Sequence, residues 1–174
     1  MIDSIGIYRQ ANKLVDACGT RNAISIADKI GIEIMYVDYF KDLLGMYTCK
    51  WKKRIITLNG RMDEYLTQMV VAHEIGHDTY HRALARGNGL KEFTLFYMKN
   101  DNEYVANAFG AHLLLETDEV LHYAQQGYDV VQVSKAMNSE INLMLIKMQE
   151  LNRLGYNLKL PTEPQADFFK KVQI

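Results

Sequence analysis

The chain has 174 residues, of which 48% are hydrophobic, and its 20 Lys and Arg residues nearly balance its 21 Asp and Glu residues. A chain of this size is expected to form one domain. The charge balance excludes a general basic surface for nucleic acid, and the apolar content with only 2 Pro residues excludes a disordered chain. No apolar run is longer than four residues, so we expect no transmembrane helix.

The beginning of the chain and its cysteines bear on its location. The first residues, MIDSIGIYRQ, lack the basic start and the long apolar stretch of a signal peptide. The two cysteines, Cys18 and Cys49, form no CxxC pair, so we expect both thiols to be reduced. Together these features predict a cytoplasmic protein.

Helical and extended patterns alternate in the first third of the chain. Apolar spacing predicts helices over residues 5–17 and 21–30, and β-branched and apolar residues predict strands over 32–37, 45–51 and 54–58. The segment ISIADKIGI resembles the first half of a helix-turn-helix, but a strand follows it instead of a recognition helix, which argues against DNA binding. The sequence KWKKR between the last two strands is either a basic, aromatic patch or a solvated hairpin turn, and we favour the turn.

A long helix is predicted over residues 62–81, where apolar residues recur at intervals of three and four. Residues 90–98 are ambiguous between strand and helix because their apolar residues are crowded at one end. A helix through residues 103–116 follows, and its predicted cap is Asp101 or Asn102.

The remaining segments predict further helices and a tail. These helices are expected over residues 117–126, 129–137 and 139–154, and the pair Phe168-Phe169 in the tail is expected to pack back onto the body. The sequence therefore predicts an α+β fold: a mainly helical single domain over residues 1–174, with about three antiparallel or mixed strands packed beside the long helix.

The segment HEIGH places His73 and His77 four residues apart in the predicted long helix. Side chains at this spacing lie one turn apart on the same face, so both imidazoles can reach one metal ion. Glu74 lies about 100° round the helix axis, which suits a general base that does not bind the metal. This HExxH pattern is typical of zinc peptidases, and the alternative is a helix with two partly buried histidines whose hydrogen bonds are satisfied.

A catalytic zinc site needs a third protein ligand and an open position for water. The class HExxHxxGxxH is excluded, because this chain has Tyr80 and Ala83 where that class requires Gly and His. A carboxylate from a later segment is the alternative, and the downstream candidates are Glu92, Asp101, Glu103, Glu116, Asp118 and Glu119. Glu103 is best placed, because Ala106 and Gly110 after it allow two helices to approach closely. Its alternative role is a first-turn Glu that stabilises its own helix.

Two segments of the chain resemble the ImmA/IrrE family of metallo-endopeptidases. They are AHEIGHDTYH, residues 72–81, and EYVANAFGAHLLL, residues 103–115, which resembles the ExxAN helix of that family. The likeness covers about residues 20–120. The chain departs from the family pattern at Gly110 and at Leu115-Glu116, where the family often has Ala and Met-Pro.

The resemblance implies that His73, His77 and Glu103 bind one zinc ion and that Glu74 is the general base. It also implies a site-specific endopeptidase that cleaves a helix-turn-helix repressor of a mobile element, a prophage or a stress-response system, with no direct role for nucleic acid or membrane. The alternative is a non-catalytic antirepressor, in which zinc is structural and the repressor is bound without being cut. Glu74 favours the enzyme, because a purely structural site does not need it.

Three neighbouring residues are candidates for supporting the ligands. His81 is expected to be structural or to contact a ligand, since the site already has its ligands. Asp78 either orients a ligand imidazole or is a solvated surface carboxylate, and Asn107 either steadies Glu103 or ties its helix to a loop. A hydrogen-bond donor to the reacting carbonyl oxygen is also expected, and the spacing does not choose among Tyr80, Tyr97, Tyr104 and His112.

Overall fold

The structure is a computed structural model that describes residues 2–87, 89–92, 94–96, 98 and 100–160. Its helices are α1 (Ser4–Cys18), α2 (Ala23–Lys29), α3 (Glu64–Tyr80), α4 (Asp101–Leu114), α5 (Thr117–Gln125), α6 (Val130–Ala136), α7 (Ile141–Arg153) and the short 3₁₀ helix η1 (Leu84–Arg86). Its strands are β1 (Glu33–Val37), β2 (Gly45–Lys50), β3 (Lys53–Asn59) and β4 (Leu90–Glu92). The pair Phe168-Phe169, expected to pack onto the body, lies outside the described residues.

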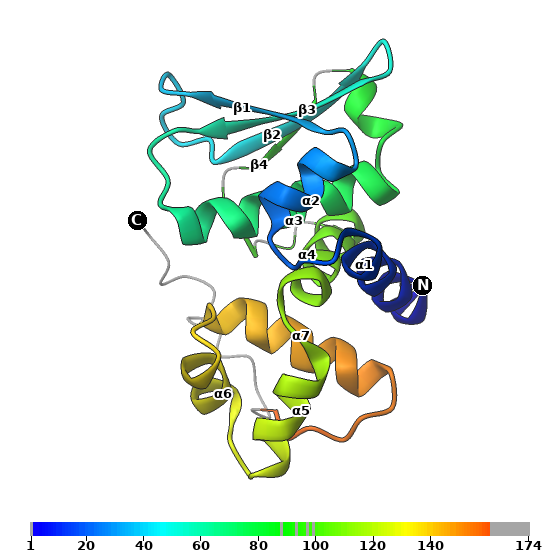
Figure 1. Ribbon diagram of the computed structural model, residues 1–174, viewed down its shortest axis with the longest axis vertical. Coiled ribbons are helices and arrows are strands. Elements are labelled where there is room, and N and C mark those ends of the chain that lie inside the picture. The colour runs from blue at the N-terminus through cyan, green and yellow to red at the C-terminus, as the bar shows by residue number, and fades with distance from the viewer. Residues whose placement is uncertain (1, 88, 93, 97, 99, 161–174) are drawn as a thin grey trace.

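The sheet occupies one end of the molecule and helices make up the rest (Figure 1). Helices α2 and α3 lie along one side of the sheet, α1 and α4 cross the middle, and α5, α6 and α7 form the opposite end. The α+β class and the packing of the sheet beside the HExxH helix are confirmed. Within the described residues, no helix combines the length and the apolar character that crossing a membrane requires.

The sheet is mixed, with the order β1-β3-β2-β4. Strand β1 is parallel to β3, whereas β2 is antiparallel to both β3 and β4. Strand β4 is the part of the ambiguous segment 90–98 that becomes extended, because it pairs with residues 45–47 of β2. The sheet therefore has four strands where the sequence predicted about three, and β4 brings the chain to the edge that faces the HExxH helix.

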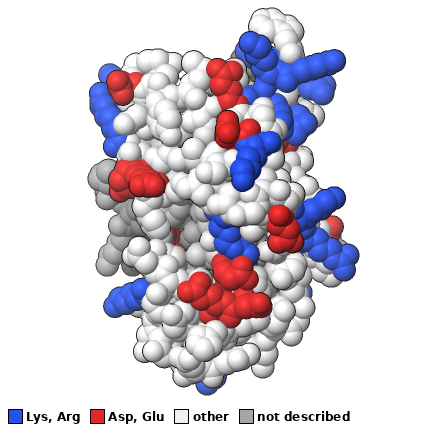
Figure 2. All heavy atoms as spheres, viewed as in Figure 1, with Lys and Arg blue, Asp and Glu red and all other residues white. Residues whose placement is uncertain are grey.

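The predicted hairpin between β2 and β3 is confirmed, and it carries a concentration of positive charge. Trp51 and Lys52 form its turn with positive φ angles of 48° and 66°, and Trp51 is 94% exposed. Lys and Arg side chains gather over this end of the molecule (Figure 2). A hollow of about 720 Å³ there is lined by Cys49, Lys50, Trp51, Lys52, Arg54, Arg82 and Arg86. None of these residues is a candidate metal ligand, so the hollow and the HExxH site are separate features.

Helices α3 and α4 approach each other closely, as the small residues predicted. A Cβ atom on Gly76 would lie 2.9 Å from the Cα atom of Ala106 and 3.0 Å from its carbonyl oxygen, distances too short for any side chain. Gly110 faces the backbone nitrogen of His73 in the same interface. The sequence identified Ala106 and Gly110 but not Gly76, whose lack of a side chain is what lets α4 lie against the HExxH turn.

The start of α4 is set by a side-chain cap. The Asn100 side chain accepts hydrogen bonds from the backbone N–H groups of Asn102 and Glu103, at 2.9 and 3.1 Å. The sequence placed this cap at Asp101 or Asn102, which is slightly too late, because all three residues are of types that favour capping. The cap puts Glu103 in the first turn of α4, at the end of the helix nearest the sheet edge.

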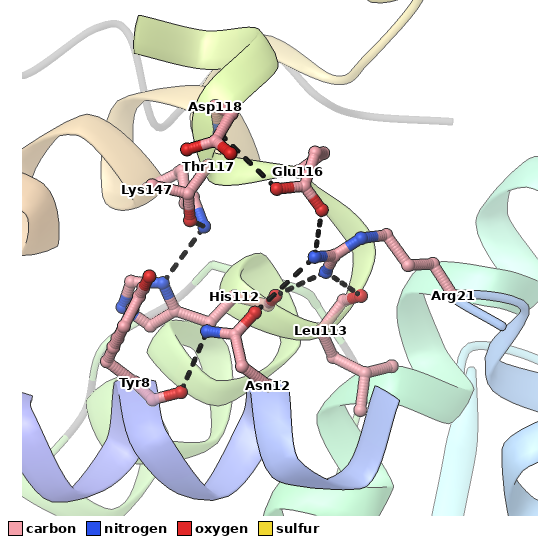
Figure 3. Close-up of polar contacts among 9 residues, drawn as sticks. All are labelled: Tyr8, Asn12, Arg21, His112, Leu113, Glu116, Thr117, Asp118 and Lys147. Carbon is pink, nitrogen blue, oxygen red and sulfur yellow. Dashed lines mark hydrogen bonds and ion pairs between the residues drawn. The ribbon is translucent and has the colours of Figure 1, made fainter. Parts of the chain in front are cut away.

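The far end of α4 is held by a buried polar junction with neighbouring segments (Figure 3). Lys147 of α7 donates to the hydroxyl oxygen of Thr117 at 2.9 Å and lies 3.1 Å from Nδ1 of His112. Arg21, in the loop after α1, donates to the carbonyl oxygen of His112 at 3.0 Å and pairs with Glu116. Polar contacts from two sides therefore fix the position of α4 relative to the rest of the chain.

Candidate metal centre

The two HExxH histidines lie on the face of α3 that is covered by α4. Both side chains are buried, and their Nε2 atoms lie 3.0 Å apart. The helix geometry causes this, because positions four residues apart are stacked one turn above the other. Two ring nitrogens at this distance suit neighbouring ligands of one ion, whose bonds to imidazole nitrogen are about 2.0–2.1 Å for zinc.

Glu103 joins this pair from the first turn of α4. Its Oε2 atom lies 3.4 Å from Nε2 of His73 and 3.6 Å from Nε2 of His77. One donor atom from each of the three residues lies within 4.8 Å of the others, and this is the group among the described residues able to hold a metal ion. Two imidazoles and one carboxylate are the donor set of many catalytic zinc sites, so the residues present fit such an ion.

The remaining ring nitrogens are engaged in a way that orients both imidazoles. Nδ1 of His73 donates to Oδ1 of Asn107 at 2.9 Å, and Nδ1 of His77 lies 2.9 Å from Nδ1 of His81. These contacts leave both Nε2 atoms free to face the ion, which is the usual arrangement of metal-bound histidines. Asn107 thus contacts a histidine, whereas the sequence suggested that it steadies Glu103 or ties its helix to a loop.

The charges around His73 favour a cation at its Nε2 atom. Burial by itself lowers the pKa of the ring, but the carboxylates of Glu103 and Glu92 outweigh it and raise the pKa to about 10. For Glu103, burial opposes ionisation, and hydrogen bonds to His73 and His77 overcome it and lower the pKa. Burial lowers the pKa of His77, and the hydrogen bond to Glu103 opposes this effect only in part. The site therefore favours a positive charge between its rings and carboxylates, and a metal ion could supply that charge in place of a proton.

Glu74 lies next to His73 in the chain but is not part of the His-His-Glu group. Its side chain is fully buried, and neither carboxylate oxygen has a hydrogen-bond partner among the described residues. Burial raises the pKa of Glu74 to about 8, and the negative charges of Glu92 and Glu103 add to this effect. The start of β2 approaches it, since a Cβ atom on Gly45 would lie 3.2 Å from Oε1 of Glu74. A buried carboxylate with unused acceptors and a raised pKa has the properties of a general base.

Asp78 serves a different purpose from either one suggested by the sequence. It is only 3% exposed, so the solvated alternative is wrong. It accepts hydrogen bonds from the hydroxyl of Tyr47 at 2.5 Å and from Arg54 and Arg82 at 2.9 and 2.8 Å. Its partners come from β2, from β3 and from the segment just after α3, so Asp78 attaches the helix to the sheet instead of orienting a ligand imidazole.

Two of the candidates for contacting the carbonyl oxygen, Tyr104 and His112, have other partners. The Tyr104 hydroxyl donates to Glu150 at 2.5 Å, and His112 belongs to the junction with Lys147. The Tyr80 ring packs against Phe109. Tyr97 lies outside the described residues. Among the downstream carboxylates, Glu116 pairs with Arg21, and Glu92 reaches the metal centre beside Glu103.

Comparison with known proteins agrees with this geometry. The model of a peptidase family described as the IrrE N-terminal-like domain matches residues 27–146, which is more than half of the chain and contains the whole His-His-Glu group. The chain belongs to the ImmA/IrrE peptidase family. The match reaches α7, well beyond residues 20–120 where the sequence motifs showed the likeness.

A protein from a bacteriophage aligns with most of this chain. The chain is 25% identical over 148 residues to the "uncharacterized immunity region protein 2" of Bacillus phage phi105, and the alignment covers 85% of this chain and 91% of that protein. Family membership implies a metal-dependent peptidase, and the His-His-Glu group has donor atoms that could hold a metal ion.

Proposed function

We propose that this protein is a zinc-dependent, site-specific endopeptidase. The observation that carries the proposal is the placement of the buried, unpartnered carboxylate of Glu74 beside the group formed by His73, His77 and Glu103. A structural zinc site has no need of such a carboxylate, whereas hydrolysis of a peptide needs a base next to the metal.

The reaction follows from the roles of these side chains. Bound zinc supplies Lewis acidity, which makes a water molecule more acidic and stabilises negative charge on the carbonyl oxygen. Glu74 accepts the proton of the attacking water and returns it to the nitrogen of the leaving amine. Asn107 and His81 keep the two imidazoles in their orientation throughout. The peptide bond is cleaved without a covalent bond to the protein.

The proposed substrate is a helix-turn-helix repressor of a mobile element or prophage. Two findings support this class of substrate: the chain belongs to the ImmA/IrrE family, and its phage relative is named as an immunity region protein. A repressor acts on the chromosome, so this substrate agrees with the cytoplasmic location predicted from the sequence.

The deciding experiment uses the variant Glu74→Gln, which keeps the size of the side chain but removes the base. The purified wild type and variant are incubated with a helix-turn-helix protein encoded beside this gene, and separately with a peptide library, with and without EDTA. Mass spectrometry identifies the fragments. We expect the variant to lose about 10²–10⁴-fold in cleavage rate and to keep one zinc ion per chain.

Glu119→Gln, a change of the same type at an exposed position on α5, is the matched control and should cleave as the wild type does. Cleavage by Glu74→Gln at the wild-type rate would contradict the proposed mechanism. An intact repressor that nevertheless binds both proteins equally would indicate the non-catalytic antirepressor instead.

A further inference from the structure

Glu92 is a second carboxylate that reaches the metal-binding histidines. Its side chain is only 11% exposed, and its Oε2 atom lies 3.1 Å from Nε2 of His73, compared with 3.4 Å for Oε2 of Glu103. Its Oε1 atom accepts the backbone N–H of Thr94 at 3.1 Å, and its carbonyl oxygen accepts the N–H of Leu44 at 2.8 Å. The pairing of β4 with β2 therefore holds one oxygen of this carboxylate at the site.

The single Nε2 atom of His73 cannot satisfy two carboxylates once a metal ion is bound. Nδ1 of the ring donates to Asn107, so a neutral ring presents only a lone pair at Nε2. When an ion takes this lone pair, Nε2 carries no proton, and Glu92 receives no hydrogen bond from the ring. No Lys or Arg forms a salt bridge with Glu92 within the described part of the chain. A buried carboxylate without a cation is costly, and the ion itself is the partner at hand.

We propose that Glu92 binds the metal ion as a fourth protein ligand when no substrate is present. The proposal rests on the proposed function, because it takes His73, His77 and Glu103 as the other three ligands. A zinc site with four protein ligands is closed, whereas a catalytic site leaves one position for water. Departure of Glu92 opens that position. The carboxylate therefore keeps the peptidase inactive until a substrate at the edge of β4 displaces it.

The test measures whether a small molecule can reach the metal. Wild type, Glu92→Gln, Glu92→Ala and the control Glu119→Gln are loaded with Co²⁺ in place of zinc, and acetohydroxamate is titrated while the visible spectrum of Co²⁺ is recorded. Acetohydroxamate binds where the metal has an open position. We expect both Glu92 variants to bind it at least about tenfold more tightly than the wild type and the control do, and to lose zinc to a chelator about tenfold more readily.

Equal affinity for acetohydroxamate in all four proteins would overturn the proposal, and so would unchanged retention of zinc. Unchanged affinity combined with slower cleavage would give Glu92 a role in holding water and would exclude it as a ligand. A wild type that binds neither zinc nor Co²⁺ would overturn the proposed function as well, which distinguishes the two failures. Glu92→Asp, which keeps the charge but shortens the side chain, provides a second variant if the others fail to fold, and we expect the same tighter binding.

Discussion

Helix α4 contributes to two buried polar clusters, the metal centre near its N-terminus and the junction with α7 near its C-terminus. Both contain buried histidines, and His73 and His112 respond to opposite surroundings. At the metal centre, carboxylates outweigh the effect of burial and raise the pKa of His73 to about 10. At the junction, burial and the charge of Lys147 lower the pKa of His112 to about 3.

The difference shows that a buried histidine is not by itself a metal ligand. At the junction, the amine of Lys147 already has Thr117 and Nδ1 of His112 as partners and lies 5.9 Å above the ring of Tyr8. A metal ion there would meet a positive charge. At the metal centre, Glu92 and Glu103 create a negative environment that a cation satisfies. Two carboxylates lie within 3.4 Å of Nε2 of His73, whereas His112 has one carboxylate, Glu150, at 4.0 Å and the amine of Lys147 at 3.1 Å. The balance of charges around a histidine, rather than its burial, separates the two cases.

The largest effect is expected from matched changes of these two histidines. His73→Gln removes a ligand and should reduce bound zinc to near zero, whereas His112→Gln should keep about one zinc ion per chain. Metal analysis of protein purified without a histidine tag, with circular dichroism to show that both variants fold, makes the measurement. A folded His112→Gln protein without zinc, or a His73→Gln protein with one zinc ion per chain, would contradict the difference between the two clusters.

A smaller effect concerns the charge of Lys147. Burial lowers its pKa from 10.5 to about 7, and the charge of Arg21 adds to the shift. Between these pH values the unfolded chain binds a proton that the folded chain does not, so the free energy of unfolding rises with pH by about 1.4 kcal/mol per unit. Lys147→Met lacks this rise. Between pH 7 and pH 9 we expect the free energy of unfolding of the wild type to rise by about 2 kcal/mol more than that of the variant. Urea unfolding of the zinc-loaded proteins makes the measurement.

Lys135→Met is the control for this measurement, because Lys135 is exposed on α6. Its free energy of unfolding should run parallel to that of the wild type over the same pH range. If the Lys147→Met curve also runs parallel, the pKa of Lys147 is not lowered in the folded protein, and the expected effect of burial on this amine is absent.

The smallest effect is expected from the residue that orients His73. Asn107→Ala removes the acceptor for Nδ1 of the ring and should weaken zinc binding about tenfold, the usual result of losing such a partner. Competition with a chromogenic chelator gives the affinity, and Asn102→Ala, exposed on the same helix, should leave it unchanged. Equal losses in the two variants would point to a general effect on α4 and not to the orientation of the ring.

Sequence patterns predicted a structural feature correctly wherever the whole feature lies within one helix or one hairpin. The helices and the hairpin follow from apolar spacing and turn residues, and the order of elements from the sequence matches the structure except for the short 3₁₀ helix η1 and the short strand β4. That strand has only three residues, and its extended state depends on pairing with β2. A segment of this length has too little pattern of its own to be assigned without its partner.

The residues of the metal centre fall into the same two groups, those related within one helix and those brought together by different elements. The sequence by itself determined the pair His73 and His77 and the position of Glu74 between them, because the geometry of a single helix relates all three. Only the tertiary structure decided that Glu92 and Asn107 meet this pair, that Asp78 faces the sheet, and that His112 does not belong to the site. These contacts join α3 to α4 and to the edge of the sheet, and no spacing within one element encodes which side chains a second element brings to it.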